Sequence, residues 1–209
     1  MICPDCRREI PYVQEPRCMH CGKPLHRETE EYCPDCRGYR FYIREGRSVW
    51  LHRGKVPGAI YNFKYHNRRR YGKIFAGEMV RCCGGDIRRW QIGVIIPVPL
   101  HPSRKRIRGY NQAEILAEEL SRFTGIPAKN NILYRIRRTS PQKKLDGKER
   151  RKNLRGAFAV KKGEHLPENV LLIDDIYTTG STVEKCAKML RLAGAENVYF
   201  LTVSIGQGT

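Results

Sequence analysis

The chain has 209 residues, which is long enough for one full-sized hydrophobic core and a small accessory module. Forty lysines and arginines against 21 acidic residues leave a net charge of +19, a balance that favours polyanionic partners such as nucleic acids or phosphate-rich substrates. The sequence has no apolar run of about 18 residues, and its N-terminus, MICPDCRRE, lacks the apolar stretch of a secretory signal, so we expect no membrane insertion and a cytoplasmic location.

Three Cys-x-x-Cys pairs lie within the first 36 residues, and this spacing in a cytoplasmic protein indicates a bound metal ion rather than disulfides. Two such pairs supply the four thiolates of a tetrahedral zinc site, which has no open position for catalysis, so the expected zinc ion is structural. The stretch CMHCGKPL has the form of a ribbon knuckle, and CPDCRG supplies its mate. The favoured zinc ligands are Cys18, Cys21, Cys33 and Cys36.

The first pair, Cys3 and Cys6, leaves two interpretations open. It is either a remnant pair, or it completes a second zinc site with His20 or His26. Six thiolates are too many for one tetrahedral ion and too few for two, so both cysteines stay on the list of candidate ligands. We place this zinc-ribbon module at residues 1–45.

The remaining chain, 46–209, alternates between predicted strands and helices. A short strand is expected at 48–52, a helical region at 57–82, and a buried strand at 92–100 that its two prolines must terminate. The following helix is expected to start at the N-cap Asn111 and to end at Gly125.

The C-terminal part shows the same alternation of strands and capped helices. A strand at 170–174 precedes a helix with Ser181 as its N-cap and Glu184 completing the capping box, and a last strand follows at 198–205. Continuous apolar strands that alternate with helices predict an α/β fold, in which helices cover both faces of a parallel sheet and ligands bind at the carboxyl ends of the strands.

The stretch VLLIDDIYTTGST, residues 170–182, combines a strand, two acids and a polar turn before a helix. Free amides and the helix dipole favour phosphate at such a turn, and Gly180 lets the backbone approach the ligand closely. The carboxylates of Asp174 and Asp175 repel phosphate but accept hydrogen bonds from hydroxyls, so a ribose 5-phosphate satisfies both groups. The lysine of a nucleoside triphosphatase loop is absent after Gly180. The candidate phosphate ligands are Thr178, Thr179, Gly180, Ser181 and Thr182.

This stretch resembles the phosphoribosyl pyrophosphate motif of type I phosphoribosyltransferases. The block PVPLHPSRKRIRGYNQAEILA is similar to one in the ComF/GntX family, with Tyr110 where Phe is usual. A second similar block is RTSPQKKLDGKERRKNLRGAF, which matches through Arg138, Thr139, Gln142, Leu145, Arg150, Asn153 and Phe158. The cysteine pairs also fit, although longer members carry four pairs and this chain has three.

The resemblance implies a type I phosphoribosyltransferase-like domain that binds phosphoribosyl pyrophosphate with Mg²⁺ and transfers the ribosyl group to an unknown acceptor, with release of pyrophosphate. The implied catalytic residues are Asp174, Asp175 and Arg150. Arg108 and the backbone at Pro99 and Leu100 would contact pyrophosphate, under a lid formed by residues 135–155. That window holds ten basic residues against two acids, so we expect it to order over a polyanion. Hypoxanthine-type relatives carry an acid where Thr178 stands, which speaks against a 6-oxopurine acceptor.

Two other functions compete with the transferase. ComF relatives are tied to DNA uptake in natural competence, so single-stranded DNA and the competence machinery are candidate partners. Five basic residues within 64–73 and four within 104–108 lie near Tyr61, Phe63, Tyr65, Tyr71 and Tyr110, although most of these rings are expected to pack in the core. The third hypothesis is a regulator that senses phosphoribosyl pyrophosphate without turning it over. A homodimer is among the candidate assemblies.

Overall fold

A computed structural model describes residues 2–37, 42–137 and 156–206 of the chain. Its centre is a four-stranded sheet in the order β1–β6–β5–β2, and all three strand pairs are parallel. The strands are β1 (Glu45–Leu51), β6 (Asn197–Ile205), β5 (Asn169–Tyr177) and β2 (Val94–Pro97). Every residue from Val170 to Ile173 on β5 is fully buried, as expected of a central strand covered on both faces.

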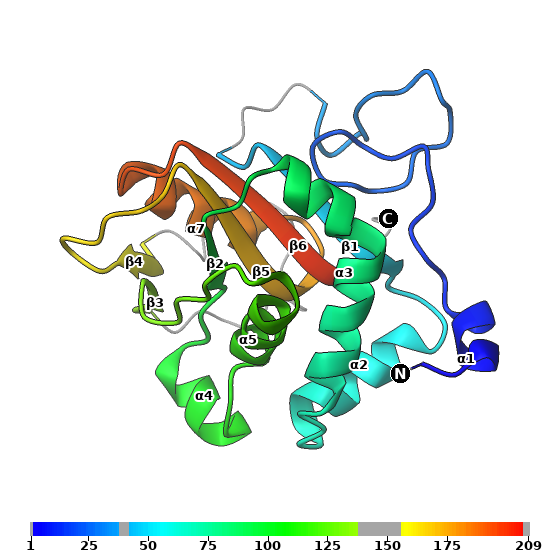
Figure 1. The fold of residues 1–209 in the computed structure, drawn as a ribbon, viewed down its shortest axis with the longest axis horizontal. Helices are drawn as coiled ribbons and strands as arrows, with labels where there is room; N and C mark the ends of the chain where they lie inside the picture. The colour runs from blue at the N-terminus through cyan, green and yellow to red at the C-terminus, as the bar shows by residue number, and fades with distance from the viewer. Residues whose placement is uncertain (1, 38–41, 138–155, 207–209) are drawn as a thin grey trace.

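Helices cover both faces of this sheet, which confirms the expected α/β fold (Figure 1). One face packs against α2 (Val56–Tyr65), α3 (Tyr71–Arg89) and α5 (Gln112–Thr124). The other face packs against α7 (Ser181–Leu192) and the buried cysteines of the N-terminal module. The smaller elements are α1 (Pro4–Glu9), α4 (Pro102–Arg108) and the antiparallel pair β3 (Leu133–Arg135) and β4 (Phe158–Val160).

The helical region predicted at 57–82 consists of two helices. The break follows His66, where Asn67 has a left-handed φ of 50° and three arginines come in succession. A left-handed residue interrupts the hydrogen-bond ladder of a right-handed helix, so the chain changes direction here and α3 begins at Tyr71. The end of α2 is thereby free to reach the carboxyl end of the sheet.

The strand predicted at 92–100 is shorter than expected, and this shortening opens the sheet. β2 pairs with β5 only from Val94 to Pro97, opposite Val170 to Ile173, and the Val98 amide adds one bond to the Ile173 carbonyl at 2.9 Å. β5 continues to Tyr177 beside β6. Asp174 and the residues that follow it therefore have a strand neighbour on one side only, and the other side is open to a cavity.

Both outer strands carry a neighbouring segment over part of their length. Beside β1, the Val13 amide donates to Val49 and the Leu51 amide donates to Pro11, at 3.0 and 2.8 Å. Beside β2, residue Ile95 is bracketed by the Pro127 carbonyl and the Lys129 amide, each at 2.9 Å. These bonds satisfy backbone groups that an unprotected edge would leave open.

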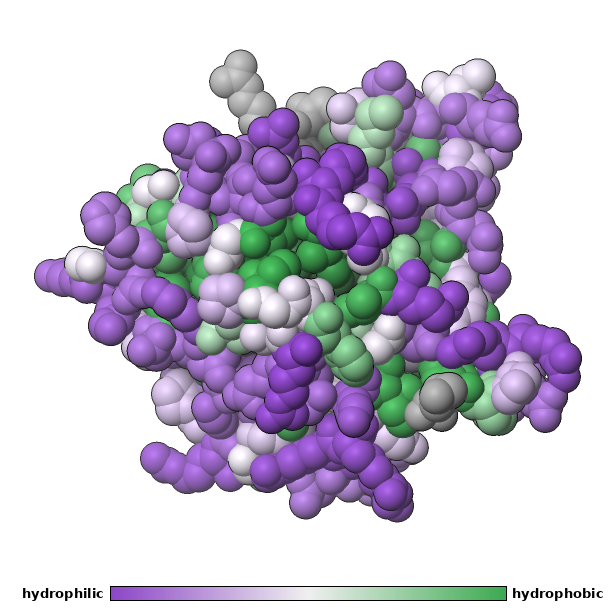
Figure 2. All heavy atoms as spheres, viewed as in Figure 1, coloured by the Kyte–Doolittle hydropathy of each residue, from purple (hydrophilic) through white to green (hydrophobic). Residues whose placement is uncertain are grey.

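The face of the molecule drawn in Figure 2 is predominantly polar. Figure 2 shows hydrophilic residues over most of one face, with hydrophobic residues in patches toward its middle. No helix in the described ranges is long and apolar enough to cross a membrane.

Gly46 on β1 offers a direct test of how tightly side chains pack on the face of the sheet that carries Phe200. A Cβ atom at this position would lie 1.9 Å from the Phe200 ring, so Gly46→Ala must displace that ring and should destabilise the protein by about 2–3 kcal/mol. The matched control is Gly85→Ala in α3, where a Cβ meets open space and should stabilise the helix by about 0.5–1 kcal/mol. Urea unfolding measures the change in stability for both variants. Equal changes in the two would contradict close packing of Gly46 against the Phe200 ring.

Candidate functional site

A cavity of about 700 Å³ lies where β2 stops and β5 continues. The residues that line it come from the ends of these strands and the loops that follow them, from α2, α4, α5 and α7, and from β3. The cavity is lined by most of the residues that the sequence predicts to bind the ligand or to act in catalysis: Pro99, Leu100, Arg108, Asp174, Asp175, Thr178, Gly180, Ser181 and Thr182. Residues 83 positions apart in sequence thus meet in one pocket, at the edge of the sheet expected for a ligand.

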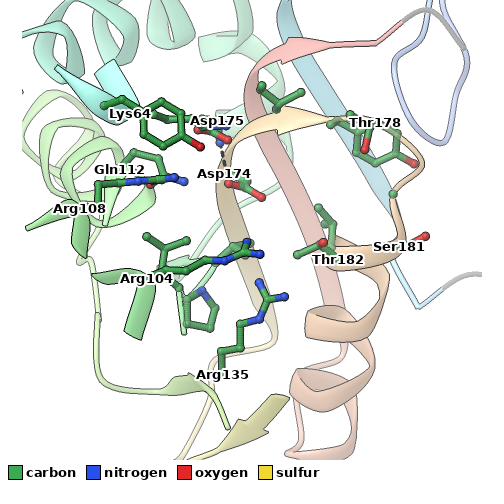
Figure 3. A pocket seen from close by; sticks show the side chains of 18 of the residues that line it. Lys64, Arg104, Arg108, Gln112, Arg135, Asp174, Asp175, Thr178, Ser181 and Thr182 are labelled. Atoms are coloured by element: carbon green, nitrogen blue, oxygen red, sulfur yellow. Dashed lines mark hydrogen bonds and ion pairs between the residues drawn. The ribbon is translucent and has the colours of Figure 1, made fainter. Parts of the chain in front are cut away.

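The turn at residues 178–182 joins β5 to α7 and forms one wall of the cavity (Figure 3). Ser181 is predicted as the N-cap of α7, and this prediction is wrong by one residue: Gly180 is the N-cap, with a left-handed φ of 70°, and no side chain caps the helix. The Ser181 hydroxyl instead lies 3.0 Å from the Thr179 hydroxyl. No side chain of the cap accepts a hydrogen bond from the first turn, and a helix start of this kind favours an anion. Thr179 itself is exposed and does not line the cavity.

The loop after β2 forms the facing wall, and Asn111 holds it in place. The Asn111 side chain accepts a hydrogen bond from the Ala113 amide at 3.1 Å, as the predicted N-cap of α5, and donates to the Val98 carbonyl at 3.0 Å. One buried amide group thus fixes both the helix start and the loop at Pro99 and Leu100.

The two adjacent acids point to different partners. Asp175 is buried and pairs with Lys64 of α2, whose Nζ lies 2.7 Å from its carboxylate. Asp174 accepts a hydrogen bond from the Asp175 amide at 2.8 Å and faces the cavity (Figure 3). Burial, reinforced by the negative charge of Asp175, raises the pKa of Asp174 to about 8.

Arg104 of α4 and Arg135 of β3 extend toward each other and toward Asp174 (Figure 3). Arg135 is only 9% exposed, and its guanidinium lies 5.4 Å from the centre of the Phe158 ring. Burial, together with the positive charge of Arg104, lowers the pKa of Arg135. Two converging guanidinium groups on a desolvated wall favour an anion between them.

A ridge of exposed aromatic and basic side chains borders the cavity on the α2 side. The rings of Tyr61 and Tyr65 have centroids 4.9 Å apart and are more than half exposed, and the Arg108 guanidinium lies 4.8 Å over the Tyr65 ring. Core packing is the prediction for most of the nearby aromatics, and it is confirmed: Phe63 and Tyr110 are buried and Tyr71 packs against the core, whereas Tyr61 and Tyr65 are exposed. Tyr65 and Arg108 also line the cavity, so the ridge and the cavity are continuous.

The four favoured zinc ligands, Cys18, Cys21, Cys33 and Cys36, form a buried cluster whose sulfur atoms all lie within 4.8 Å of one another. A regular tetrahedron with zinc–sulfur bonds of about 2.3 Å requires sulfur atoms about 3.8 Å apart. The Cys21 and Cys33 sulfurs are 3.7 Å apart, so the cluster fits a zinc ion closely. Four thiolates leave no coordination position for a substrate, which makes this zinc site structural.

The first cysteine pair lies outside this cluster. Cys3 and Cys6 are exposed on α1, where the Cys6 amide donates to the Cys3 sulfur at 3.4 Å. His20 is buried and its Nε2 lies 3.7 Å from the Glu184 carboxylate. A second metal site at Cys3 and Cys6 therefore stays a prediction, and the described residues place no third or fourth ligand beside them.

The ribbon cysteines lie directly behind the 178–182 turn. Tyr177, the residue before the turn, belongs to the same buried cluster as the four cysteines and stacks on Phe200 with centroids 4.6 Å apart. Burial raises the pKa of Tyr177 well above its usual value.

One predicted residue and most of one predicted segment lie beyond the described ranges. Arg150 is outside them, as is the stretch 138–155 of the expected lid. The described remainder of that segment, 135–137, contributes Arg135 to the cavity.

The sequence does not predict three cationic residues as part of the site: Lys64, Arg104 and Arg135. Each lies in a run of basic residues where nothing local distinguishes it from its neighbours. Their selection depends on tertiary structure, because the end of α2, the start of α4 and the strand β3 meet only in the folded chain.

Comparison with known proteins gives two kinds of match. Residues 1–37 match the family described as the double zinc ribbon domain. Competence protein F of Haemophilus influenzae is 34% identical over 202 residues, covering 94% of this chain and 87% of that protein. Competence protein ComFC of Streptococcus pneumoniae is 28% identical over 94% of this chain and 84% of its own. DNA utilization protein YhgH of Escherichia coli O157:H7 is 37% identical over 107 residues, which cover 50% of this chain and 45% of that protein.

The stability of the Asp174→Asn variant relative to the parent protein should be higher at pH 8 than at pH 5. The folded protein keeps the Asp174 proton to about pH 8, whereas an unfolded chain releases it near the ordinary value of 3.8. Between these values the folded state binds one proton more than the unfolded state, so this carboxyl lowers stability as the pH rises. The gain of the variant over the parent, from urea unfolding at both pH values, should grow by about 3–4 kcal/mol from pH 5 to pH 8. A gain that is the same at both pH values would mean that Asp174 is already ionised at pH 5.

Proposed function

Because the chain belongs to the family of competence protein F and ComFC, we propose that it serves DNA uptake by binding phosphoribosyl pyrophosphate in the cavity between β2 and β5. The relatives' names concern competence and DNA utilization, and they support the broad role in DNA uptake. The ligand is supported by the chemistry of the cavity and by the motif at residues 170–182. The single observation that carries it is the meeting of an uncapped helix start and two acids in one pocket with converging arginines.

Each part of the ligand has a group of matching chemistry. The 5-phosphate goes to the 178–182 turn, where main-chain amides and the hydroxyls of Thr178, Ser181 and Thr182 are donors. The ribose hydroxyls donate to Asp174 and Asp175, which the adjacent strand end places beside that turn. The pyrophosphate lies toward Arg104 and Arg135, whose mutual repulsion an anion relieves.

If the ligand is turned over, a nitrogen nucleophile displaces pyrophosphate at the ribose C1 atom. Positive charge develops on the sugar ring, and Asp174, once hydroxyl donors and Mg²⁺ of the bound ligand favour its ionised form, would stabilise that charge. The arginines hold the departing pyrophosphate by charge. Mg²⁺, which prefers oxygen ligands, would bind together with the diphosphate and neutralise part of its charge. Lys64 already pairs with Asp175, so Asp174 is the acid open to the ligand.

The acid pair is the test of this proposal. Asp174→Asn combined with Asp175→Asn should weaken binding of magnesium phosphoribosyl pyrophosphate at least ten-fold, because the ribose hydroxyls lose both carboxyl acceptors. Isothermal titration calorimetry measures the affinity, and circular dichroism and zinc content report on the fold. The matched control is Asp5→Asn on α1, an exposed acid outside the cavity, which should leave affinity unchanged. Absence of binding to the parent protein would contradict the proposal.

A screen for pyrophosphate release then separates an enzyme from a sensor. The parent protein is mixed with the sugar diphosphate and, in turn, with nucleobases and short single-stranded DNA. Release with one acceptor class identifies a phosphoribosyltransferase. Tight binding without release from any acceptor supports the regulator that senses phosphoribosyl pyrophosphate.

A second activity, binding of single-stranded DNA, is favoured by the aromatic ridge on α2. Tyr61 and Tyr65 offer successive exposed rings, and Tyr61 also lies 5.5 Å from the His66 ring. Nucleobases stack on such rings while nearby arginines neutralise the backbone phosphates. Because the ridge runs into the cavity at Tyr65, a strand bound there would bring a base to the proposed ribose site.

Tyr61→Ala combined with Tyr65→Ala should weaken binding of a fluorescent oligothymidylate at least ten-fold, because each lost stacking contact contributes about 1–3 kcal/mol. Fluorescence anisotropy at two salt concentrations measures the affinity and its electrostatic part. Tyr32→Ala removes an exposed tyrosine from the N-terminal module and serves as the control. An equal loss of affinity in the Tyr61 and Tyr65 double variant and in Tyr32→Ala would contradict a role of the ridge in DNA binding.

A further inference from the structure

We propose that the zinc ribbon holds the 178–182 turn in its ligand-binding shape, and that Tyr177 and Glu184 are the positioning residues that connect them. The inference rests on the proposed function for the identity of the ligand. The coupling itself is a property of the packing between the ribbon and the sheet. It makes zinc occupancy a condition for ligand binding at a site that contains no zinc ligand.

The first connection passes through Tyr177. Its ring is 6% exposed and lies almost parallel to the Phe200 ring, at an interplanar angle of 4°. A Cβ atom on Gly180 would lie 2.3 Å from the Tyr177 hydroxyl oxygen, so the phenol lies directly against the turn. Tyr177 also shares a buried cluster with the four zinc-binding cysteines. The phenol is therefore packed between the metal site and the backbone of the turn.

The second connection passes through Glu184 in the first turn of α7. One carboxylate oxygen lies 3.7 Å from His20 Nε2, and the other accepts a hydrogen bond from the Tyr42 amide at 3.0 Å. His20 lies between Cys18 and Cys21 in the sequence, so it cannot move independently of the metal site. The Glu184 amide donates to the Gly180 carbonyl at 2.8 Å, which joins this carboxylate to the turn itself.

Glu184 is predicted to complete a capping box, and the structure gives it this other role instead. A capping box would use the carboxylate to satisfy an amide of its own helix end. Here the carboxylate binds segments from the N-terminal module, and Gly180 stands at the N-cap without a side-chain partner. The acid is thus withdrawn from the anion-binding amides and used to anchor the helix to the ribbon.

The ribbon depends on its metal for these contacts. Of its described residues, only α1 forms a regular helix, and no long strand is present between Ile10 and Arg37. Small modules of this kind take their conformation from the zinc–thiolate bonds and lose it with the metal. Loss of zinc would therefore release His20 and expose one side of Tyr177, and the turn would lose both supports.

The experiment compares the full chain with and without zinc by hydrogen–deuterium exchange, and zinc content is measured in each sample. Peptides that cover 177–184 should exchange faster after zinc removal, while those of α5 stay protected. Binding of magnesium phosphoribosyl pyrophosphate, measured after the chelator is removed, should weaken at least ten-fold. Unchanged protection of 177–184 in zinc-free protein overturns the inference.

A variant that keeps its zinc distinguishes a local change in the turn from general unfolding. Glu184→Gln should retain full zinc content, raise exchange within 178–184 and weaken ligand binding several-fold, because the neutral amide holds His20 and the Tyr42 amide less strongly. Glu196→Gln, an exposed acid beyond α7, is the matched control and should change neither quantity. A Glu184→Gln protein with unchanged exchange in the turn overturns the coupling. Zinc-dependent protection without any binding of the sugar diphosphate refutes the proposed function and leaves the coupling standing.

Discussion

The early end of β2 beside a longer β5 is the constraint on which the site depends. Hydrogen bonding to β2 ends near Ile173, so the next residues of β5 have backbone and side chains that face an open space. Had β2 continued alongside, Asp174 and Asp175 would lie inside a four-stranded sheet, and no ligand would reach them. The prolines at 97 and 99 lack amides on the side of β2 that faces away from β5, because the Ile95 amide donates to Pro127 and the Val98 amide to Ile173, so they end the hydrogen bonding of the outer edge. The cavity is thus a consequence of strand length.

The electrostatics of the cavity are consistent with a ligand that carries both hydroxyls and phosphate. Asp175 is neutralised by Lys64, Asp174 keeps its proton to about pH 8, and Arg135 is a buried cation close to Arg104. The positive charges of Arg104 and Arg135 repel each other, and the carboxyl of Asp174 is desolvated by burial. An anion at the arginines and a hydrogen-bond donor at Asp174 would reduce both costs.

The sequence predicts best those features that local residue patterns control. The helix between Asn111 and Gly125 begins and ends where predicted, since both residues act through their own backbone geometry. The four-cysteine cluster follows from spacing in the same way. Ser181 is misplaced by one residue because serine and glycine both suit an N-cap, and only the left-handed backbone at 180 distinguishes them. Lys64 and Arg135 reach the cavity through tertiary contacts, so no local pattern marks them out among forty basic residues.

The segments that flank the two outer strands also bear on self-association. Residues 11–13 occupy part of the free side of β1, and residues 127–129 occupy part of the free side of β2. Two copies of the chain cannot simply continue one sheet into the other, because the outer backbone groups at these positions already have partners. A homodimer would have to form through side chains on helices or on the ribbon, and its interface would then be set by surface charge, of which this chain carries a large positive excess.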